Sequence, residues 1–177
     1  MLRRRELVRS LGPRFSQAFA EIHGNPPASI RYRSDARVEA AQPESEICEA
    51  IRLGLAAHLG VDQRRGFTGF GPHTDDLEIL LGDRLARDHG SQGQIRSLVL
   101  AFKFAELRHV EERNGETPVL LLDDVASELD EERRARLFET ISGTACQTLL
   151  TVTERGLLPE LPGRVDWRVR AGRIEPV

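Results

Sequence analysis

The stretch from Val119 to Asp130, VLLLDDVASELD, limits the fold of this chain more than any other. Its first four residues form a continuous apolar run, which is typical of a strand buried on both faces of a parallel sheet. Two carboxylates, Asp123 and Asp124, follow directly, and open α/β sheets bind ligands at the carboxyl ends of their strands. The stretch therefore predicts either a ligand site at a sheet edge or a strand that ends in an ordinary polar turn.

The residue types in this stretch suit phosphate chemistry. A hydrated Mg²⁺ ion prefers one or two carboxylates together with phosphate oxygens, and a second carboxylate can orient or deprotonate a water molecule. Asp130 is expected to cap a helix that begins at Glu131. Capping alone accounts for Asp130, but it does not account for Ser127 and Glu128 following the double aspartate.

The segment Gly90 to Phe104, GSQGQIRSLVLAFKF, predicts a helix that opens at Ser91. Gly93 lies in its first turn, where glycine costs about 1 kcal/mol relative to alanine. One explanation is local, since Ser91 and Gln94 have the spacing of a capping box. The other is functional, since a hydroxyl and bare backbone at a helix N-terminus form a seat for phosphate.

Apolar spacing and turn residues predict the other elements, and their order gives an α/β class with a parallel sheet in the second half. The buried side of the helix from Ser91 is expected to hold Ile95, Leu98, Val99 and Phe102. The remaining elements are a helix from Leu2 to about His23 that ends or kinks at Gly12–Pro13, a strand over 29–34, a helix over 45–59, a loop over 64–73, a strand over 76–81 with a turn at 82–83, a helix over 131–141, a buried strand over 146–153 and two short strands near 165–174.

Together, SQGQ at the start of a long helix and the later VLLLDDVASELD resemble the C-terminal lobe of an ATP-binding-cassette (ABC) ATPase head. With GFGPHTDDLEILL added, the three segments resemble the RecF family, whose heads are related to those of SMC proteins. The resemblance runs from the first helix to the tail. It implies a head lobe of parallel sheet and helices over residues 63–177, preceded over 1–62 by the end of a helical arm with its return strand.

The resemblance also implies site residues and ligands. Asp123 matches the Walker B aspartate associated with Mg²⁺, and Asp124 stands where most cassette ATPases have the catalytic glutamate. The signature motif, which meets the γ-phosphate of ATP bound to a partner subunit, corresponds to Ser91, Gln92, Gly93 and Gln94. Ser127 and Asp130 correspond to the D-loop. At the switch position, where many cassette ATPases have histidine, the candidates are Thr151, Thr153 and Glu154, with no choice among them.

The family also implies partners and a cellular role. RecF-like proteins dimerise on ATP, bind single- and double-stranded DNA, and work with RecO and RecR in DNA replication, repair, recombination and the SOS response. The chain contains no G-x-x-x-x-G-K-[ST] phosphate loop. We therefore expect a C-terminal fragment that begins inside the arm and does not hydrolyse ATP alone. Without an apolar run of membrane length or a targeting segment, a cytoplasmic location is expected.

Local basic clusters are the candidates for DNA contact, because the net charge of −3 gives no global attraction to nucleic acid. Arg31 and Arg33 project from one face of the predicted strand, and Arg64 and Arg65 form a second pair. Such charges are often only a solvated face. Two other functions remain open: the head of an SMC or RecN relative, and a non-catalytic module kept for DNA binding or dimerisation.

Overall fold

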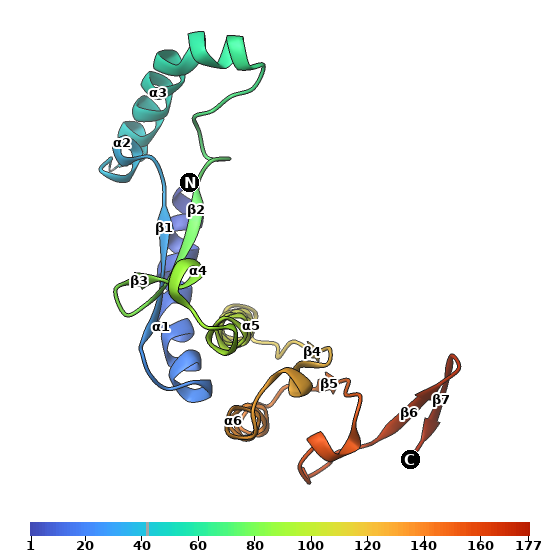
Figure 1. Cartoon of the computed structure of the whole chain (residues 1–177). Helices are drawn as coiled ribbons and strands as arrows, with labels where there is room; N and C mark the ends of the chain where they lie inside the picture. Colours follow the sequence, from blue (N-terminus) through green and yellow to red (C-terminus); the bar gives the residue numbers. More distant parts are fainter. Residues whose placement is uncertain (42) are drawn as a thin grey trace. The chain divides into compact units, whose positions relative to one another are not determined.

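A computed structural model describes residues 1–41 and 43–177 (Figure 1). The chain divides into two compact units, unit 1 over residues 1–117 and unit 2 over residues 118–177. The boundary between these units is set by contacts within the chain. The boundary expected between residues 62 and 63 separates a helical arm from a head lobe, which is a different division, and it stays a prediction.

Unit 1 holds most of the helices and an antiparallel sheet with the strand order β1-β2-β3. Its elements are α1 (Leu2–Ile22), β1 (Ala28–Arg33), α2 (Ala36–Glu39), α3 (Glu44–Arg65), β2 (Asp76–Leu81), β3 (Arg84–Leu85), α4 (Ala86–His89) and α5 (Gln92–Asn114).

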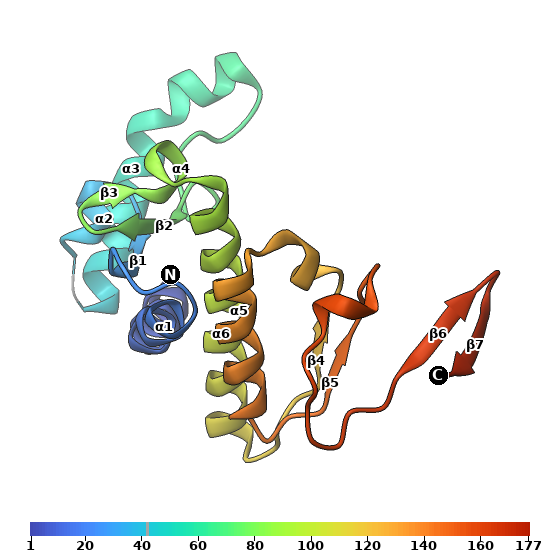
Figure 2. The ribbon, with the colours of Figure 1, turned by 60° about the horizontal axis from the view of Figure 1, so that its bottom comes forward.

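The core of unit 1 lies between α1 and α5, which pack side by side (Figure 2). Phe15 and Phe19 of α1 and Phe104 of α5 are fully buried. The helix predicted over 2–23 is confirmed, but it does not end at Gly12–Pro13, since α1 continues through Pro13. Hydrophobic burial therefore outweighs the one backbone hydrogen bond that proline removes.

The buried side of α5 differs from the predicted one. Leu98 is buried as expected, but Ile95 and Val99 are 37% and 58% exposed. The buried set also includes Ser97 and Phe104. Since α5 carries apolar residues on several sides, its packing against α1 decides which side is covered, and the i, i+3, i+4 spacing alone does not.

The sheet of unit 1 follows the alternation predicted for its first strand. Ile30 and Tyr32 of β1 are more buried than Arg31 and Arg33, which are exposed on the opposite face. The strand predicted over 76–81 is confirmed as β2, and the two-residue turn Gly82–Asp83 joins it to β3. This hairpin leads through α4 to the start of α5.

The long helix α3 extends further than its predicted end at residue 59. Arg64 and Arg65 form its last turn, so the prediction of a loop at these two residues is wrong. Gly66 ends the helix in the left-handed conformation with φ 77°, which glycine adopts without strain. Phe70 in the following loop packs so closely on Gly54 that a Cβ added there would lie 2.2 Å from its ring.

Unit 2 contains the parallel pair and the C-terminal hairpin. Its elements are β4 (Leu120–Leu122), the 3-10 helix η1 (Val125–Glu128), α6 (Glu131–Ser142), β5 (Thr148–Leu150), the 3-10 helix η2 (Arg155–Leu157), β6 (Trp167–Arg170) and β7 (Arg173–Pro176). The α/β class and the parallel pairing of the two apolar strands are confirmed, as are α6 and the two short strands of the tail.

The prediction that both faces of the parallel strands are buried is wrong. Leu120 and Leu122 are buried, but Leu121 between them is 69% exposed. Leu149 of β5, opposite Leu121, is 56% exposed. Alternate side chains of a strand point to opposite faces, so one face of this two-stranded ladder is open. Among the described residues no helix is long and apolar enough to cross a membrane.

Candidate functional site

The predicted capping box is present at the start of α5. The backbone N–H of Gln94 donates to Oγ of Ser91 over 3.2 Å, and the backbone N–H of Ser91 donates to Oε1 of Gln94 over 2.9 Å. Two of the N–H groups at the start of the helix are thereby satisfied. Ser91 and Gln92 are exposed, whereas Gly93 and Gln94 are partly buried.

The first turn of α5 is also tied to the end of α1. The hydroxyl of Ser97, which is fully buried, donates to the backbone carbonyl of Gly93 over 3.0 Å. The same oxygen lies 3.2 Å from Nδ1 of His23, the residue that caps α1. The segment Ser91–Gln94 therefore sits on a turn held by its own cap and by the packed α1–α5 pair.

The two aspartates after β4 meet a hydroxyl from the end of β5. Thr151, the residue after β5, donates its hydroxyl to Oδ1 of Asp123 over 2.5 Å. The backbone N–H of Asp124 donates to the same hydroxyl oxygen over 2.9 Å. The backbone N–H of Thr151 donates to the carbonyl of Leu122 over 2.9 Å, which extends the parallel ladder by one step.

Asp124 has an unusual backbone. Its φ of 49° and ψ of 23° place it in the left-handed region, which aspartate visits more readily than most residues other than glycine. The hydroxyl of Ser127 donates to the carbonyl of Asp124 over 2.8 Å. The N–H and the C=O of Asp124 are thus both held by side-chain hydroxyls.

One side-chain oxygen of Asp124 is buried without a partner. Oδ1 has no hydrogen bond within the described part of the chain. A buried carboxylate oxygen without a donor is costly, because folding removes its bonds to water. Such an atom at the carboxyl end of a parallel strand is suited to a ligand that supplies a positive charge or a proton.

Asp130 caps α6, as expected. Its Oδ1 accepts from the backbone N–H of Arg133 over 2.9 Å, and its Oδ2 lies 2.5 Å from the guanidinium of Arg133. With Ser127 in η1, this cap defines the turn between β4 and α6. The structure thus brings Asp123, Asp124 and Ser127 together in unit 2, whereas Ser91–Gln94 lie in unit 1.

Thr151 is the functional candidate that sequence reasoning leaves unresolved. It is one of three switch candidates, and nothing in the letters LTVTERG favours it over Thr153 or Glu154. The structure distinguishes Thr151 by its two hydrogen bonds to the aspartate turn. The strand predicted over residues 146–153 contains both Thr151 and Thr153, so the sequence carries no signal that separates them, whereas in the structure β5 ends at Leu150.

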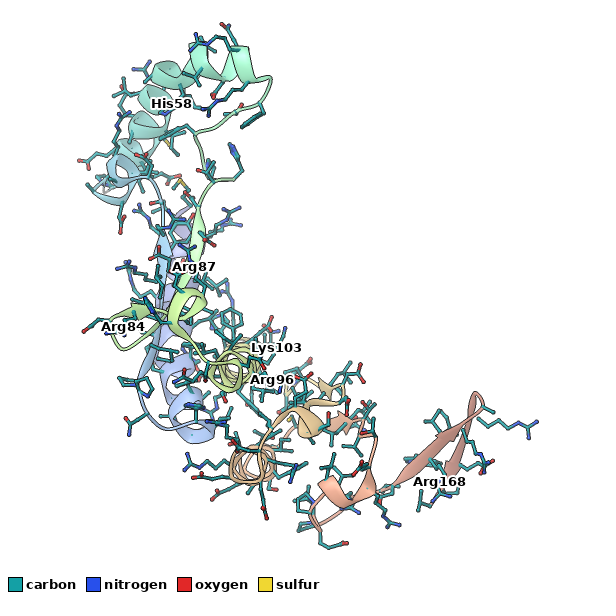
Figure 3. The ribbon with its side chains drawn as sticks, in the orientation of Figure 1. His58, Arg84, Arg87, Arg96, Lys103 and Arg168 are labelled. Atoms are coloured by element: carbon teal, nitrogen blue, oxygen red, sulfur yellow. The ribbon has the colours of Figure 1, made fainter. Side chains whose placement is uncertain are left out.

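The four candidate DNA contacts differ in their surroundings. Nε of Arg31 lies 2.6 Å from Oε2 of Glu78, and Nε of Arg33 lies 2.9 Å from Oε1 of the same carboxylate. Arg64 and Arg65 are exposed at the C-terminal end of α3. Arg84, Arg87, Arg96 and Lys103 are among the further exposed cations of unit 1 that sequence reasoning does not select (Figure 3).

The segment GPHTDD forms a hydrogen-bonded loop before β2. Nε2 of His73 lies 2.7 Å from the carbonyl of Thr68, and the hydroxyl of Thr74 donates to the carbonyl of Gly71 over 2.8 Å. The hydroxyl of Tyr32 donates to Asp75. Burial raises the pKa of Tyr32, and the hydrogen bond to Asp75 raises it further.

The chain is similar along its whole length to proteins named DNA replication and repair protein RecF. It is 43% identical over 181 residues to RecF of Anaeromyxobacter sp. (strain K), covering 100% of this chain and 49% of that protein. RecF of Geobacter sulfurreducens is 40% identical with the same coverage. The chain thus spans about half the length of the curated relatives it matches. No family model matches the chain.

Solved structures agree with this likeness. The recombination mediator protein RecF of the RecFOR pathway, solved as RecF-ATP, superposes with a TM-score of 0.79 at 30% identity, covering 98% of this chain and 45% of that one. An SMC head bound to the C-terminal winged-helix domain of ScpA superposes with a TM-score of 0.56 at 16% identity, covering 97% of this chain and 43% of that one. This second likeness shows a shared fold.

Proposed function

The chain corresponds to the C-terminal part of RecF, and from this premise we propose that it is the signature, Walker B and D-loop part of an ATP-dependent DNA repair protein. It works with a lobe that carries a phosphate loop. Its activity is ATP-controlled binding to DNA that supports recombinase loading at gaps. We assign the catalytic carboxylate to Asp124.

One observation carries this proposal: the aspartate turn after β4 is built around a buried, unpartnered carboxylate oxygen. Oδ1 of Asp124 lacks a donor within the described residues, while the peptide of Asp124 is held on both sides by the hydroxyls of Thr151 and Ser127. A turn that only ended a strand would leave this carboxylate in water, where it is best solvated. A carboxylate on a backbone held in this way, with one oxygen free of donors, suits the orientation of a water molecule.

The donor set fits Mg²⁺ and ATP. Asp123 is an exposed carboxylate at the end of β4, and Mg²⁺ prefers one or two carboxylates together with phosphate oxygens and water. We assign Asp123 to the metal, which when bound neutralises charge on the phosphates. Ser91–Gln94 are assigned to nucleotide bound by a second subunit, because a helix start attracts phosphate. Ser127 and Asp130 are assigned to the same nucleotide because they correspond to the D-loop of the family that the chain resembles.

The partners follow from the RecF likeness. Related solved structures carry RecF with ATP and place that protein in the RecFOR pathway, and a related SMC study concerns ATP-driven dimerisation and DNA stimulation. We propose an ATP-dependent homodimer that binds single- and double-stranded DNA with RecO and RecR, in the cytoplasm. Arg64 and Arg65 are the better candidates for non-specific phosphate contacts, because they are exposed, whereas Arg31 and Arg33 already share the carboxylate of Glu78.

The test is ATP hydrolysis by this chain mixed with a purified phosphate-loop lobe of a RecF-like protein, with and without DNA. Hydrolysis is expected only in the mixture, and Asp124→Asn or Ser91→Arg is expected to abolish it. Asp88→Asn, at an exposed position of α4, is the matched control and is expected to keep full activity. An inactive mixture whose two pieces demonstrably associate would contradict the ATPase assignment.

Experiments on the isolated chain test whether tight ATP binding requires the lobe that carries the phosphate loop. Without a phosphate loop it lacks the backbone cradle that holds the β- and γ-phosphates. Calorimetry with Mg-ATP is therefore expected to show no binding in the micromolar range. Micromolar affinity of the isolated chain would contradict this requirement.

A second candidate function is a non-catalytic module for dimerisation or DNA binding. It is favoured by Asp124, which stands where most cassette ATPases have the catalytic glutamate. In that case association with the other lobe and DNA binding would survive Asp124→Asn unchanged, and no hydrolysis would appear in any mixture.

A further inference from the structure

Thr151 stands apart from the other two switch candidates in its hydrogen bonds. Its hydroxyl donates to Oδ1 of Asp123 and accepts from the backbone N–H of Asp124. One oxygen atom at the end of β5 thereby joins the side chain of one aspartate to the backbone of the next. Of the three candidates, Thr151 is the one whose side chain reaches the aspartate turn.

We propose that Thr151 is a positioning residue that fixes the Asp123 carboxylate and the Asp124 peptide relative to each other. The inference rests on the proposed function, in which these two aspartates serve the metal and the attacking water. Thr151 itself touches neither. It acts through the two aspartates, and within the LTVTERG segment it is the residue whose hydrogen bonds join the end of β5 to them.

The backbone of Asp124 explains why such a residue is needed. A non-glycine residue is less stable in the left-handed region than in the right-handed one, so the turn relaxes unless its surroundings hold it. Ser127 holds the C=O of Asp124 from within the turn, at 2.8 Å. Thr151 holds the N–H from the neighbouring strand, and this is the link that ties the turn to the sheet.

The location of Thr151 makes the link stiff. Its own N–H donates to the carbonyl of Leu122, the last residue of β4, so its backbone is part of the parallel ladder. A β-branched side chain on such a backbone has few χ1 rotamers. The hydroxyl is therefore already placed, and little conformational entropy is lost when both hydrogen bonds form.

The first arm of the test needs no catalytic activity. Amide hydrogen exchange of Asp124 is measured by NMR in this chain and in three variants. Thr151→Val keeps the shape and removes the hydroxyl, so exchange at Asp124 is expected to quicken by at least ~10-fold, the equivalent of one hydrogen bond of about 1.4 kcal/mol. Thr151→Ser and the control Thr153→Val are expected to keep the native rate. Equal rates in all four proteins would overturn the proposal.

The second arm uses the mixture with the phosphate-loop lobe. Thr151→Val is expected to lower kcat by roughly 10- to 100-fold at nearly unchanged KM for ATP, because a misplaced catalytic group slows the chemical step. Thr151→Ser is expected to restore most of kcat. A general loss of folding would not be rescued by serine in this way, and an unchanged kcat in Thr151→Val would overturn the proposal.

The two arms separate failure of this inference from failure of the proposed function. A wild-type mixture without hydrolysis contradicts the ATPase, while the exchange rates still decide whether Thr151 holds the turn. If the wild-type mixture hydrolyses ATP and the Asp124 amide of Thr151→Val exchanges at the native rate, the ATPase assignment stands and the role proposed for Thr151 is wrong.

Discussion

Arg31 and Glu78 lie directly opposite each other on β1 and β2, with Nε of the arginine 2.6 Å from Oε2 of the carboxylate. Arg33 approaches the other oxygen of Glu78. The carboxylate is only 7% exposed, whereas the side chains of Arg31 and Arg33 are 62% and 50% exposed. Two cations thus neutralise one buried anion, which reduces the charge they offer to a DNA phosphate.

Replacing this carboxylate is expected to destabilise unit 1. In Glu78→Gln two guanidinium groups would face a neutral amide, and one amide hydrogen would point at a cation. We expect the free energy of unfolding to fall by about 1–3 kcal/mol, less than for a fully buried pair because the arginines reach water. Urea denaturation measures it. Glu49→Gln, at an exposed i,i+3 pair with Arg52, is the control and should leave stability almost unchanged.

The two arginine pairs are expected to behave differently in DNA binding. Charge reversal of Arg64 and Arg65 should weaken binding by the reconstituted head and reduce the slope of log K against log salt by about 1 for each phosphate that is no longer neutralised. Stability should be retained. Reversal of Arg31 and Arg33 should mainly lower stability, because it brings negative charge to Glu78. An unchanged salt slope after reversal of Arg64 and Arg65 would exclude them from the DNA interface.

Ser91 is expected to have two separable roles. Ser91→Ala removes the cap and should lower the free energy of unfolding by about 1 kcal/mol. Ser91→Asp keeps a capping oxygen and should retain stability, but its charge would repel a phosphate at the same helix start. Thermal unfolding and hydrolysis in the two-part mixture measure the two roles. A fully active Ser91→Asp mixture would show that this residue only caps α5.

Acid is expected to weaken the packing of α1 on α5. Arg14 of α1 donates to the carboxylate of Glu112 on α5, and this hydrogen bond lowers the pKa of Glu112 from its ordinary 4.5. A lowered pKa in the folded state stabilises the protein above that ordinary value, and the contribution disappears as the pH falls through the lowered one. Wild type and Glu112→Gln should therefore differ in melting temperature at pH 7 and converge as the pH falls below the ordinary pKa of Glu112. A difference that stays constant would contradict this assignment.

The start of α5 was predictable because its determinants are local. Ser91 and Gln94 form a capping box from their spacing along the chain. The covered side of the same helix was not predictable, since Ile95 and Phe104 are both strongly apolar and only α1 distinguishes them. The burial of Ser97 was not predictable either, because a serine is polar and does not fit an apolar pattern. Its burial is explained only by its hydrogen-bond partners, Gly93 and His23.

The parallel strands and the arginine pairs show a second limit. The apolar letters of β4 indicate that Leu121 is suited to burial, but among the described residues of unit 2 nothing covers it. Similarly, the alternation of β1 places Arg31 on the polar face without revealing that Glu78 stands opposite. The residue that stands opposite Arg31 is determined by the register between two strands that are distant in sequence, and the sequence of one strand does not reveal that register.

The left-handed backbone of Asp124 bears on which amino acids this position accepts. Aspartate and asparagine enter that region several times more readily than longer side chains. The shorter carboxylate therefore has a conformational reason at a position where most of the cassette ATPases that the chain resembles have glutamate. Asp124→Glu would extend the reach of the carboxylate towards water and at the same time strain the turn that aims it. Side-chain length and backbone conformation are thus matched to each other at this position. A change of the side chain alone would strain the turn.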